Sequence, residues 1–162
     1  MTEVDAKAAA ERVSLETSIE KSVASADLVI EAIPEKIELK LEMFSRVDKA
    51  APSHAILASN TSALSITEMA AATSRPRQFV GMHFFNPVHM MKLVEIVRGL
   101  ETSQETYKVA EAVAQRMGKE TVDVRESPGF ITSRINAMIG NEAFFMLQEG
   151  VASARDIDKA LK

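Results

Sequence analysis

The chain has 162 residues, of which 46% are hydrophobic and 26% are charged, and its formal net charge is −4. This balance is typical of a globular domain with a sizeable core, and the acidic charge gives no reason to expect a nucleic-acid partner. The absence of cysteine excludes disulfides and thiolate metal sites, no apolar run approaches the roughly 20 residues of a membrane span, and residues 1–12 are unlike a secretory signal, so we expect a cytoplasmic protein with no membrane partner.

Helix-forming and strand-forming segments alternate along the first 126 residues. The first predicted element is a helix over 3–12, which begins without a strand or cap before it. A short strand over 13–15, a short helix over 19–24, a strand over 26–33, a helix over 34–50 and a strand over 54–58 follow. The remaining predicted elements are a helix from residue 65, strands over 79–85 and 92–98, a helix over 103–117 and a strand over 120–124. Strands that alternate with helices indicate an α/β fold with a wound sheet.

Three local signals support these elements. The compact apolar run over 26–33 is typical of a strand buried in a parallel sheet. Pro34 is expected to open the next helix, with Glu35 in its first turn, where the helix dipole favours a carboxylate. The segment Ser65–Glu68 matches a capping box, which predicts that a helix starts there.

The composition changes at Ser127-Pro-Gly, which is typical of a helix start. Residues 130–147 are predicted to be a helix with few charges, so we expect a partner helix or a second subunit to bury it. Gly150 is predicted to end this helix, and Ser153 to start another.

This change places a domain boundary near Glu126. Residues 1–126 are predicted to be a partial α/β domain, and residues 127–162 the start of a helical domain. The first domain opens inside a helix and the second stops in its second helix, so we expect the chain to be an internal fragment of a longer protein.

A histidine and a glutamate occupy unusual positions in two successive predicted strands. His83 lies inside an apolar strand, and the period of two in the next strand puts Glu95 on one face with Leu93 and Val97. A carboxylate on an apolar face is costly unless it is paired. Because the connection between the strands is short, His83 and Glu95 can meet and form the carboxylate-held imidazole of a general base. A structural ion pair, or a core histidine bonded to the backbone, fits the same spacing.

Small polar residues follow the strand over 54–58. The loop 59–62 offers donors and acceptors for a cofactor amide or a substrate oxygen, because open parallel sheets bind ligands beyond the carboxyl ends of their strands. Glu35 occupies the same edge. The alternative interpretations are turn chemistry for the loop, helix capping for Glu35 and a solvated helix side chain for Lys40.

The sequence offers neither a metal site nor a glycine-rich phosphate loop. His54 and His89 form no HxxxH or HExxH pattern, so we predict that no metal is bound. The six glycines are scattered, and none belongs to a GxGxxG turn that opens a helix after a strand.

Five segments together resemble one family. The runs ADLVIEAIPE, SNTSALSIT, GMHFFNPV, MKLVEIVRG and ESPGFITSR are similar to the 3-hydroxyacyl-CoA dehydrogenases, in particular the 3-hydroxybutyryl-CoA type, over essentially the whole chain. The resemblance implies a Rossmann-type NAD-binding domain followed by a helical domain that dimerises. It also implies the NAD-dependent oxidation of an (S)-3-hydroxyacyl-CoA, such as 3-hydroxybutyryl-CoA, to the 3-ketoacyl-CoA.

The resemblance further implies roles for individual residues. His83 matches the catalytic base, which takes the proton from the 3-hydroxyl while hydride leaves the same carbon for the nicotinamide. Glu95 matches the carboxylate that orients this histidine, and Ser62 matches a catalytic serine near the substrate oxygen and the nicotinamide. The implied NAD-binding residues are Glu35, Lys40, Asn60, Ser62 and Asn86.

Two departures from the family pattern affect the expected activity. Ser133 stands where the family often has asparagine, and a hydroxyl has a shorter reach and one donor. The family's opening strand, GxGxxG turn and acidic ribose-binding residue have no counterpart among these residues, so we expect the fragment alone to be inactive. The alternatives are another β-hydroxyacid dehydrogenase, against which the His83 and Glu95 segments argue, and a non-catalytic remnant that serves as a fold or assembly fragment.

Overall fold

The structure, a computed structural model, describes residues 2–161 and holds one five-stranded sheet in the order β1-β2-β3-β4-β5. The strands are β1 (Leu28–Glu31), β2 (Ile56–Ser59), β3 (Phe79–Phe84), β4 (Leu93–Arg98) and β5 (Glu120–Arg125). β1, β2 and β3 run parallel, β4 is antiparallel to β3, and β5 is parallel to β4. The predicted α/β fold with a wound sheet is confirmed, with one antiparallel pair inside it.

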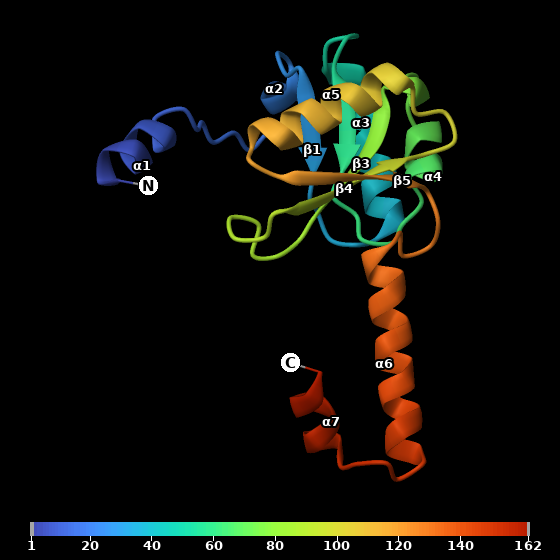
Figure 1. Cartoon of the computed structure of the whole chain (residues 1–162). Helices are drawn as coiled ribbons and strands as arrows, with labels where there is room; N and C mark the ends of the chain where they lie inside the picture. Colours follow the sequence, from blue (N-terminus) through green and yellow to red (C-terminus); the bar gives the residue numbers. More distant parts are fainter. Residues whose placement is uncertain (1, 162) are drawn as a thin grey trace.

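Helices cover both faces of this sheet (Figure 1). α2 (Ile19–Val23), α3 (Ile37–Ala50) and α4 (Ile66–Ala71) pack on one face, α5 (Gln104–Arg116) packs on the other, and a short 3-10 helix, η1 (Pro76–Gln78), leads into β3. Because side chains alternate along a strand, Phe79 and Val97 join the core beneath α3 and α4, while Val80 joins the core beneath α5. His83 and Glu95 are in phase with Phe79 and Val97, so they lie on the α3 and α4 face.

The amino-terminal segment differs from its prediction in two ways. α1 (Glu3–Ala10) does begin with a cap, because the Thr2 side chain accepts from the Asp5 amide and the Asp5 carboxylate accepts from the Thr2 amide. The predicted strand over 13–15 is wrong. Val13 and Leu15 are 69% and 98% exposed, in a stretch that runs apart from the sheet in Figure 1, and a lone extended segment has no partner for its backbone hydrogen bonds.

The prediction that Pro34 opens the next helix is wrong by three residues. α3 begins at Ile37, and Glu35 lies before it. The Glu35 carboxylate is bonded to the turn after β2, so it is not available to the first turn of α3. The predicted start at Ser65 is confirmed, because its side chain caps α4 by accepting from the Glu68 amide.

Two helices follow the sheet. α6 (Thr132–Gln148) starts two residues later than predicted, because Gly129 and Phe130 have φ values of 75° and 52°, in the left-handed region. Gly150, with φ of 72°, ends α6, and Ser153 caps α7 (Ala154–Ala160), both as predicted.

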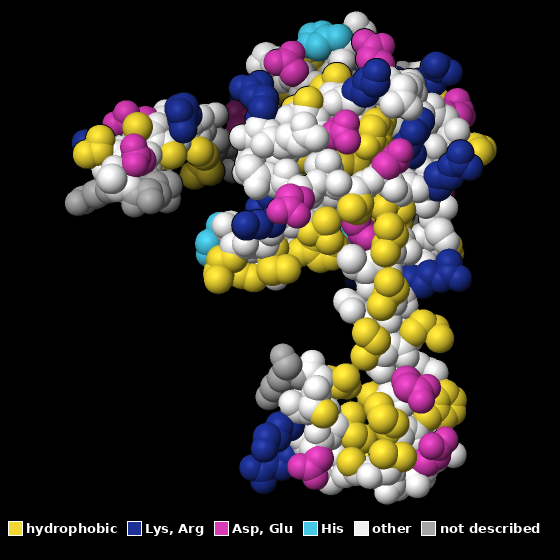
Figure 2. Space-filling view, viewed as in Figure 1, with side chains coloured by type: hydrophobic (Ala, Val, Ile, Leu, Met, Phe, Trp, Pro, Cys, Tyr) yellow, Lys and Arg dark blue, Asp and Glu magenta, His cyan; other side chains and the backbone are white. Residues whose placement is uncertain are grey.

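α6 projects away from the sheet, and α7 folds back beside its far half (Figure 1). None of the 17 residues of α6 is buried in this chain, so its apolar side chains remain on the surface, as Figure 2 shows. The exposed large apolar residues of this region are Ile131, Ile135, Met138, Ile139, Phe144, Phe145, Leu147 and Val151. Within residues 2–161, no helix is long and apolar enough to cross a membrane.

Candidate active site

His83 and Glu95 form a buried pair between two antiparallel strands. They are register partners in β3 and β4, and the short connection predicted from the sequence brings them together. His83 Nδ1 lies 2.6 Å from Glu95 Oε2, with the histidine 4% and the glutamate 0% exposed. A carboxylate accepts hydrogen bonds, so Nδ1 carries the proton in this contact. The predicted pairing of these two residues is confirmed as a contact.

The other bonds of Glu95 come from the start of α6. Glu95 Oε1 accepts from the amides of Ile131, at 3.1 Å, and Thr132, at 3.0 Å, and Oε2 also accepts from Thr132 Oγ1, at 3.2 Å. The positive end of the helix dipole favours a carboxylate at this position. Glu95 therefore has four donors, which compensates for burying its charge.

Aromatic rings enclose His83. Phe85 and Phe130 have ring centroids 4.5 Å and 5.7 Å from the imidazole. Phe130 is 4% exposed, and its left-handed backbone turns the chain from the end of β5 toward Glu95. With Nδ1 held by Glu95, Nε2 is the ring nitrogen that remains for a substrate proton. A histidine held in this way has the geometry of a general base.

The turn after β2 lies at the same edge of the sheet and is organised by Glu35. The Glu35 carboxylate accepts from Thr61 Oγ1, from the Ser62 amide at 2.9 Å and from the Ala63 amide at 3.3 Å. Burial acts to raise the pKa of Glu35, but the bonds from Thr61 and Ser62 and the nearby Lys40 ammonium outweigh it and hold that pKa below its ordinary value.

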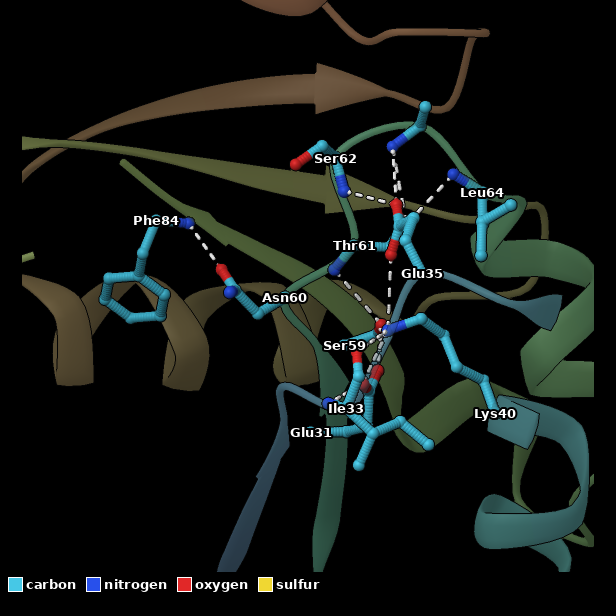
Figure 3. A network of polar contacts seen from close by, with 11 residues as sticks. Glu31, Ile33, Glu35, Lys40, Ser59, Asn60, Thr61, Ser62, Leu64 and Phe84 are labelled. Carbon is cyan, nitrogen blue, oxygen red and sulfur yellow. Dashed lines mark hydrogen bonds and ion pairs between the residues drawn. The ribbon is translucent and has the colours of Figure 1, made fainter. Parts of the chain in front are cut away.

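Lys40 is buried, contrary to the interpretation of a solvated helix lysine. It is 1% exposed, and its Nζ lies 2.5 Å from Glu31 Oε1 and 3.3 Å from Glu35 Oε2. The Glu31 carboxylate also accepts from Ser59 Oγ at 2.5 Å, which joins β1 to β2 (Figure 3). Sequence reasoning missed Glu31, although a carboxylate inside the apolar run over 26–33 is the same signal that identified Glu95.

The remaining predicted residues, Asn60, Ser62 and Asn86, follow the ends of β2 and β3. Asn60 Oδ1 accepts from the Phe84 amide at 2.8 Å, which ties the turn to the residue after His83. Ser62 is exposed, and Figure 3 shows its hydroxyl turned away from Glu35. Asn86 is exposed just beyond β3. These polar groups stand at the carboxyl edge of parallel strands, where open α/β sheets bind their ligands. No cluster of three metal-ligating side chains occurs among the residues described.

Known proteins are similar to this chain in fold and sequence. Residues 1–127 match the family model for the 3-hydroxyacyl-CoA dehydrogenase NAD binding domain, and residues 129–162 match the model for the C-terminal domain. A probable 3-hydroxybutyryl-CoA dehydrogenase of Bacillus subtilis (strain 168) is 48% identical over 161 residues, which cover 99% of this chain and 56% of that protein. The human mitochondrial hydroxyacyl-coenzyme A dehydrogenase is 44% identical over 150 residues, which cover 93% of this chain and 48% of that protein.

A solved structure agrees with these matches. The crystal structure of (S)-3-hydroxybutyryl-CoA dehydrogenase from Ralstonia eutropha has a TM-score of 0.91 and 46% identity, and the match covers 96% of this chain and 55% of that one. The chain thus spans about half the length of the relatives that it matches.

Proposed function

Since the chain belongs to the 3-hydroxyacyl-CoA dehydrogenase family, we propose that it holds the acid–base pair and the nicotinamide side of the NAD site of such an enzyme. The proposed enzyme oxidises (S)-3-hydroxyacyl-CoA, with 3-hydroxybutyryl-CoA as a substrate, to the 3-ketoacyl-CoA. The observation that carries this proposal is the His83–Glu95 contact of 2.6 Å at the edge of the sheet that also presents Ser62. In this proposal residues 1–126 belong to the nucleotide-binding domain, and residues 127–162 begin a helical domain that pairs in a homodimer.

His83 is the general base of the proposed reaction. Its Nε2 takes the proton of the substrate's 3-hydroxyl, while Glu95 keeps the imidazole oriented and stabilises its protonated form. Phe85 and Phe130 limit the access of water to the ring, and the Ser62 hydroxyl donates to the substrate oxygen. Bound NAD would supply the hydride acceptor.

The proposed NAD-binding residues divide by exposure. Ser62 and Asn86 are exposed and would contact the nicotinamide half of NAD directly. Glu35 accepts from the Thr61 hydroxyl and from the amides of Ser62 and Ala63, and Asn60 accepts from the Phe84 amide, so they contribute by holding the surfaces on which the cofactor lies. Lys40, which is 1% exposed, acts from behind Glu35.

The proposal is tested with a hybrid enzyme in which this chain replaces the matched segment of the Bacillus subtilis relative. We expect the hybrid to reduce NAD with (S)-3-hydroxybutyryl-CoA, and we expect His83→Gln to lower kcat by about 10²–10⁴-fold, the usual contribution of a positioned acid–base group. His54→Gln is the matched control, because His54 is an exposed histidine paired with Asp27. NADH affinity is expected to be retained in both variants. Full turnover in His83→Gln would exclude the assignment.

A second candidate, a non-catalytic fragment, is favoured by one observation on the 162 residues themselves. None of their six glycines forms the GxGxxG turn that would hold the cofactor pyrophosphate at a helix N-terminus. We expect the 162-residue chain to show weak NADH binding in calorimetry. An affinity in the micromolar range would contradict this second candidate.

A further inference from the structure

A buried ion pair joins the end of β1 to α3. The side chains of Glu31 and Lys40 are 0% and 1% exposed, and their charged atoms lie 2.5 Å apart. Glu31 also accepts from the Ile33 amide at 2.6 Å and from Ser59 Oγ at 2.5 Å. These partners offset much of the large cost of removing a carboxylate from water.

Lys40 connects this ion pair to Glu35, which is partly exposed at the surface. Its ammonium donates to the Ile33 carbonyl at 3.2 Å and lies 3.3 Å from Glu35 Oε2, so its three donors are directed to Glu31, Ile33 and Glu35. Glu35 in turn accepts from Thr61, Ser62 and Ala63. Figure 3 shows this continuous network from the strand end to the turn.

Stability alone does not explain a charged pair at this place. An apolar pair of similar volume is often as stable as a buried ion pair or more stable. An apolar pair, however, could not hold the Glu35 carboxylate, which precedes α3 and is itself 43% exposed at the side chain. The Lys40 ammonium lies beside the Glu35 carboxylate, and the Glu31 carboxylate balances the charge of that ammonium in the interior.

We propose that Glu31 is a positioning residue for the cofactor site: it holds Lys40, Lys40 holds Glu35, and Glu35 sets the turn that presents Ser62. This inference rests on the proposed function, in which Ser62 faces the nicotinamide and the substrate oxygen. Glu31 itself, at 4% exposure, contacts neither.

Amide hydrogen exchange of the isotope-labelled 162-residue chain tests the proposal directly. We expect Glu31→Gln to speed the exchange of the Ser62 and Ala63 amides about tenfold, which corresponds to the loss of one charge-assisted hydrogen bond. Asp48→Asn is the matched control. Asp48 is also a carboxylate paired with a partly buried cation, Arg75, at 2.7 Å, and it accepts from the Ser74 amide and hydroxyl, but it lies outside the network. We expect this control to lower Tm and to leave both amides unchanged.

A double variant separates positioning from stability if Glu31→Gln alone unfolds the chain. Glu31→Gln with Lys40→Met removes both buried charges; the glutamine oxygen still accepts from the Ile33 amide, and its NH2 group donates to Ser59 Oγ. We expect Tm to recover while Ser62 and Ala63 still exchange about tenfold faster than in the wild type. Wild-type exchange in either folded variant would overturn the proposal.

The hybrid enzyme gives a second readout. There we expect Glu31→Gln to raise KM for NAD about tenfold, with a smaller change in kcat, because the turn is displaced but His83 is not. A lower kcat at unchanged KM would overturn the proposed link to the cofactor. A wild-type hybrid without activity would refute the proposed function, and the exchange result would still decide whether Glu31 positions the turn.

Discussion

The hydrogen bonds of Glu95 predict how the substitution Glu95→Gln changes His83. The carboxylate has four donors, two on each oxygen: the amides of Ile131 and Thr132 on Oε1, and His83 Nδ1 and Thr132 Oγ1 on Oε2. Glutamine offers one acceptor oxygen and one NH2 group, so one pair of donors must face a donor. Two backbone amides cannot change their role, and leaving them unsatisfied costs about 1–3 kcal/mol each. The Thr132 hydroxyl can rotate and the imidazole can change tautomer, so the NH2 group will face these two.

The exchange of tautomers inactivates His83. When Nδ1 accepts from the glutamine NH2 group, the ring proton moves to Nε2, and Nε2 can no longer take the substrate proton. We expect kcat in the hybrid enzyme to fall by about 10²–10⁴-fold, as expected when an acid–base histidine is lost or held in the wrong tautomer. We expect the free energy of unfolding to fall by about 1.5–3 kcal/mol, the net value of a hydrogen bond to a charged group.

Nitrogen NMR of the His83 ring distinguishes the tautomers in the 162-residue chain, and NADH absorbance gives kcat in the hybrid. Glu120→Gln, an exposed glutamate at the start of β5, is the matched control and should change neither. If His83 keeps its proton on Nδ1 in Glu95→Gln and the hybrid turns over within a few-fold of the wild type, the proposed exchange of tautomers is refuted.

Three further predictions concern charge, packing and assembly. The pKa of Glu35 is lowered in the folded chain, so its stabilising contribution is present above the ordinary glutamate pKa of about 4.3 and is lost as pH falls through the lower folded value. Thermal unfolding at decreasing pH should show this loss of stability, and Glu35→Gln should abolish this pH dependence. Gly81→Ala would place a Cβ 2.8 Å from Val97 Cβ and should cost about 1–3 kcal/mol in denaturant unfolding, whereas Gly140→Ala in α6 meets nothing within 4 Å and should stabilise by up to about 1 kcal/mol. The apolar surface of α6 should cause self-association, which Phe144→Ser should reduce in light scattering; a wild-type monomer at high concentration would contradict this expectation.

Local patterns predicted most elements of the sheet and its helices. Apolar runs that alternate with helical patterns predicted the five strands of the sheet, and the signals at Ser65, Gly150 and Ser153 gave helix ends that the structure confirms. The segment over 13–15 failed because strand propensity has no value without a neighbouring strand. The predicted start of α3 is wrong because the Glu35 carboxylate accepts from the Ser62 amide in the turn after β2. Glu35 and Ser62 are 27 residues apart in the sequence, and no local rule includes a bond over that distance.

Site residues were predictable where burial and chemistry conflicted in the sequence. Glu95 was found because a carboxylate stood on an apolar strand face, and Glu31 carries the same signal. The resemblance pointed to Lys40, but its burial was not predictable, because its helical position is typical of a solvated side chain until the fold places Glu31 and Glu35 beside it. The dependence of Glu95 on the residues after β5 was hidden for a similar reason, since 36 residues separate it from Ile131.

That last contact determines how the two parts of the chain act together. The boundary predicted after Glu126 separates the sheet from the helices in sequence, yet Glu95 in β4 bonds to both His83 and the first residues of α6. α6 has no buried residue in this chain, so its amino terminus is the end that fixes its direction relative to the sheet. A shift of that terminus would remove two or three of the four donors of Glu95, and the carboxylate would then turn from His83 toward water or another donor. The correct orientation of the imidazole therefore requires α6 in place, although the hydrogen bond to His83 Nδ1 comes from Glu95 and not from α6.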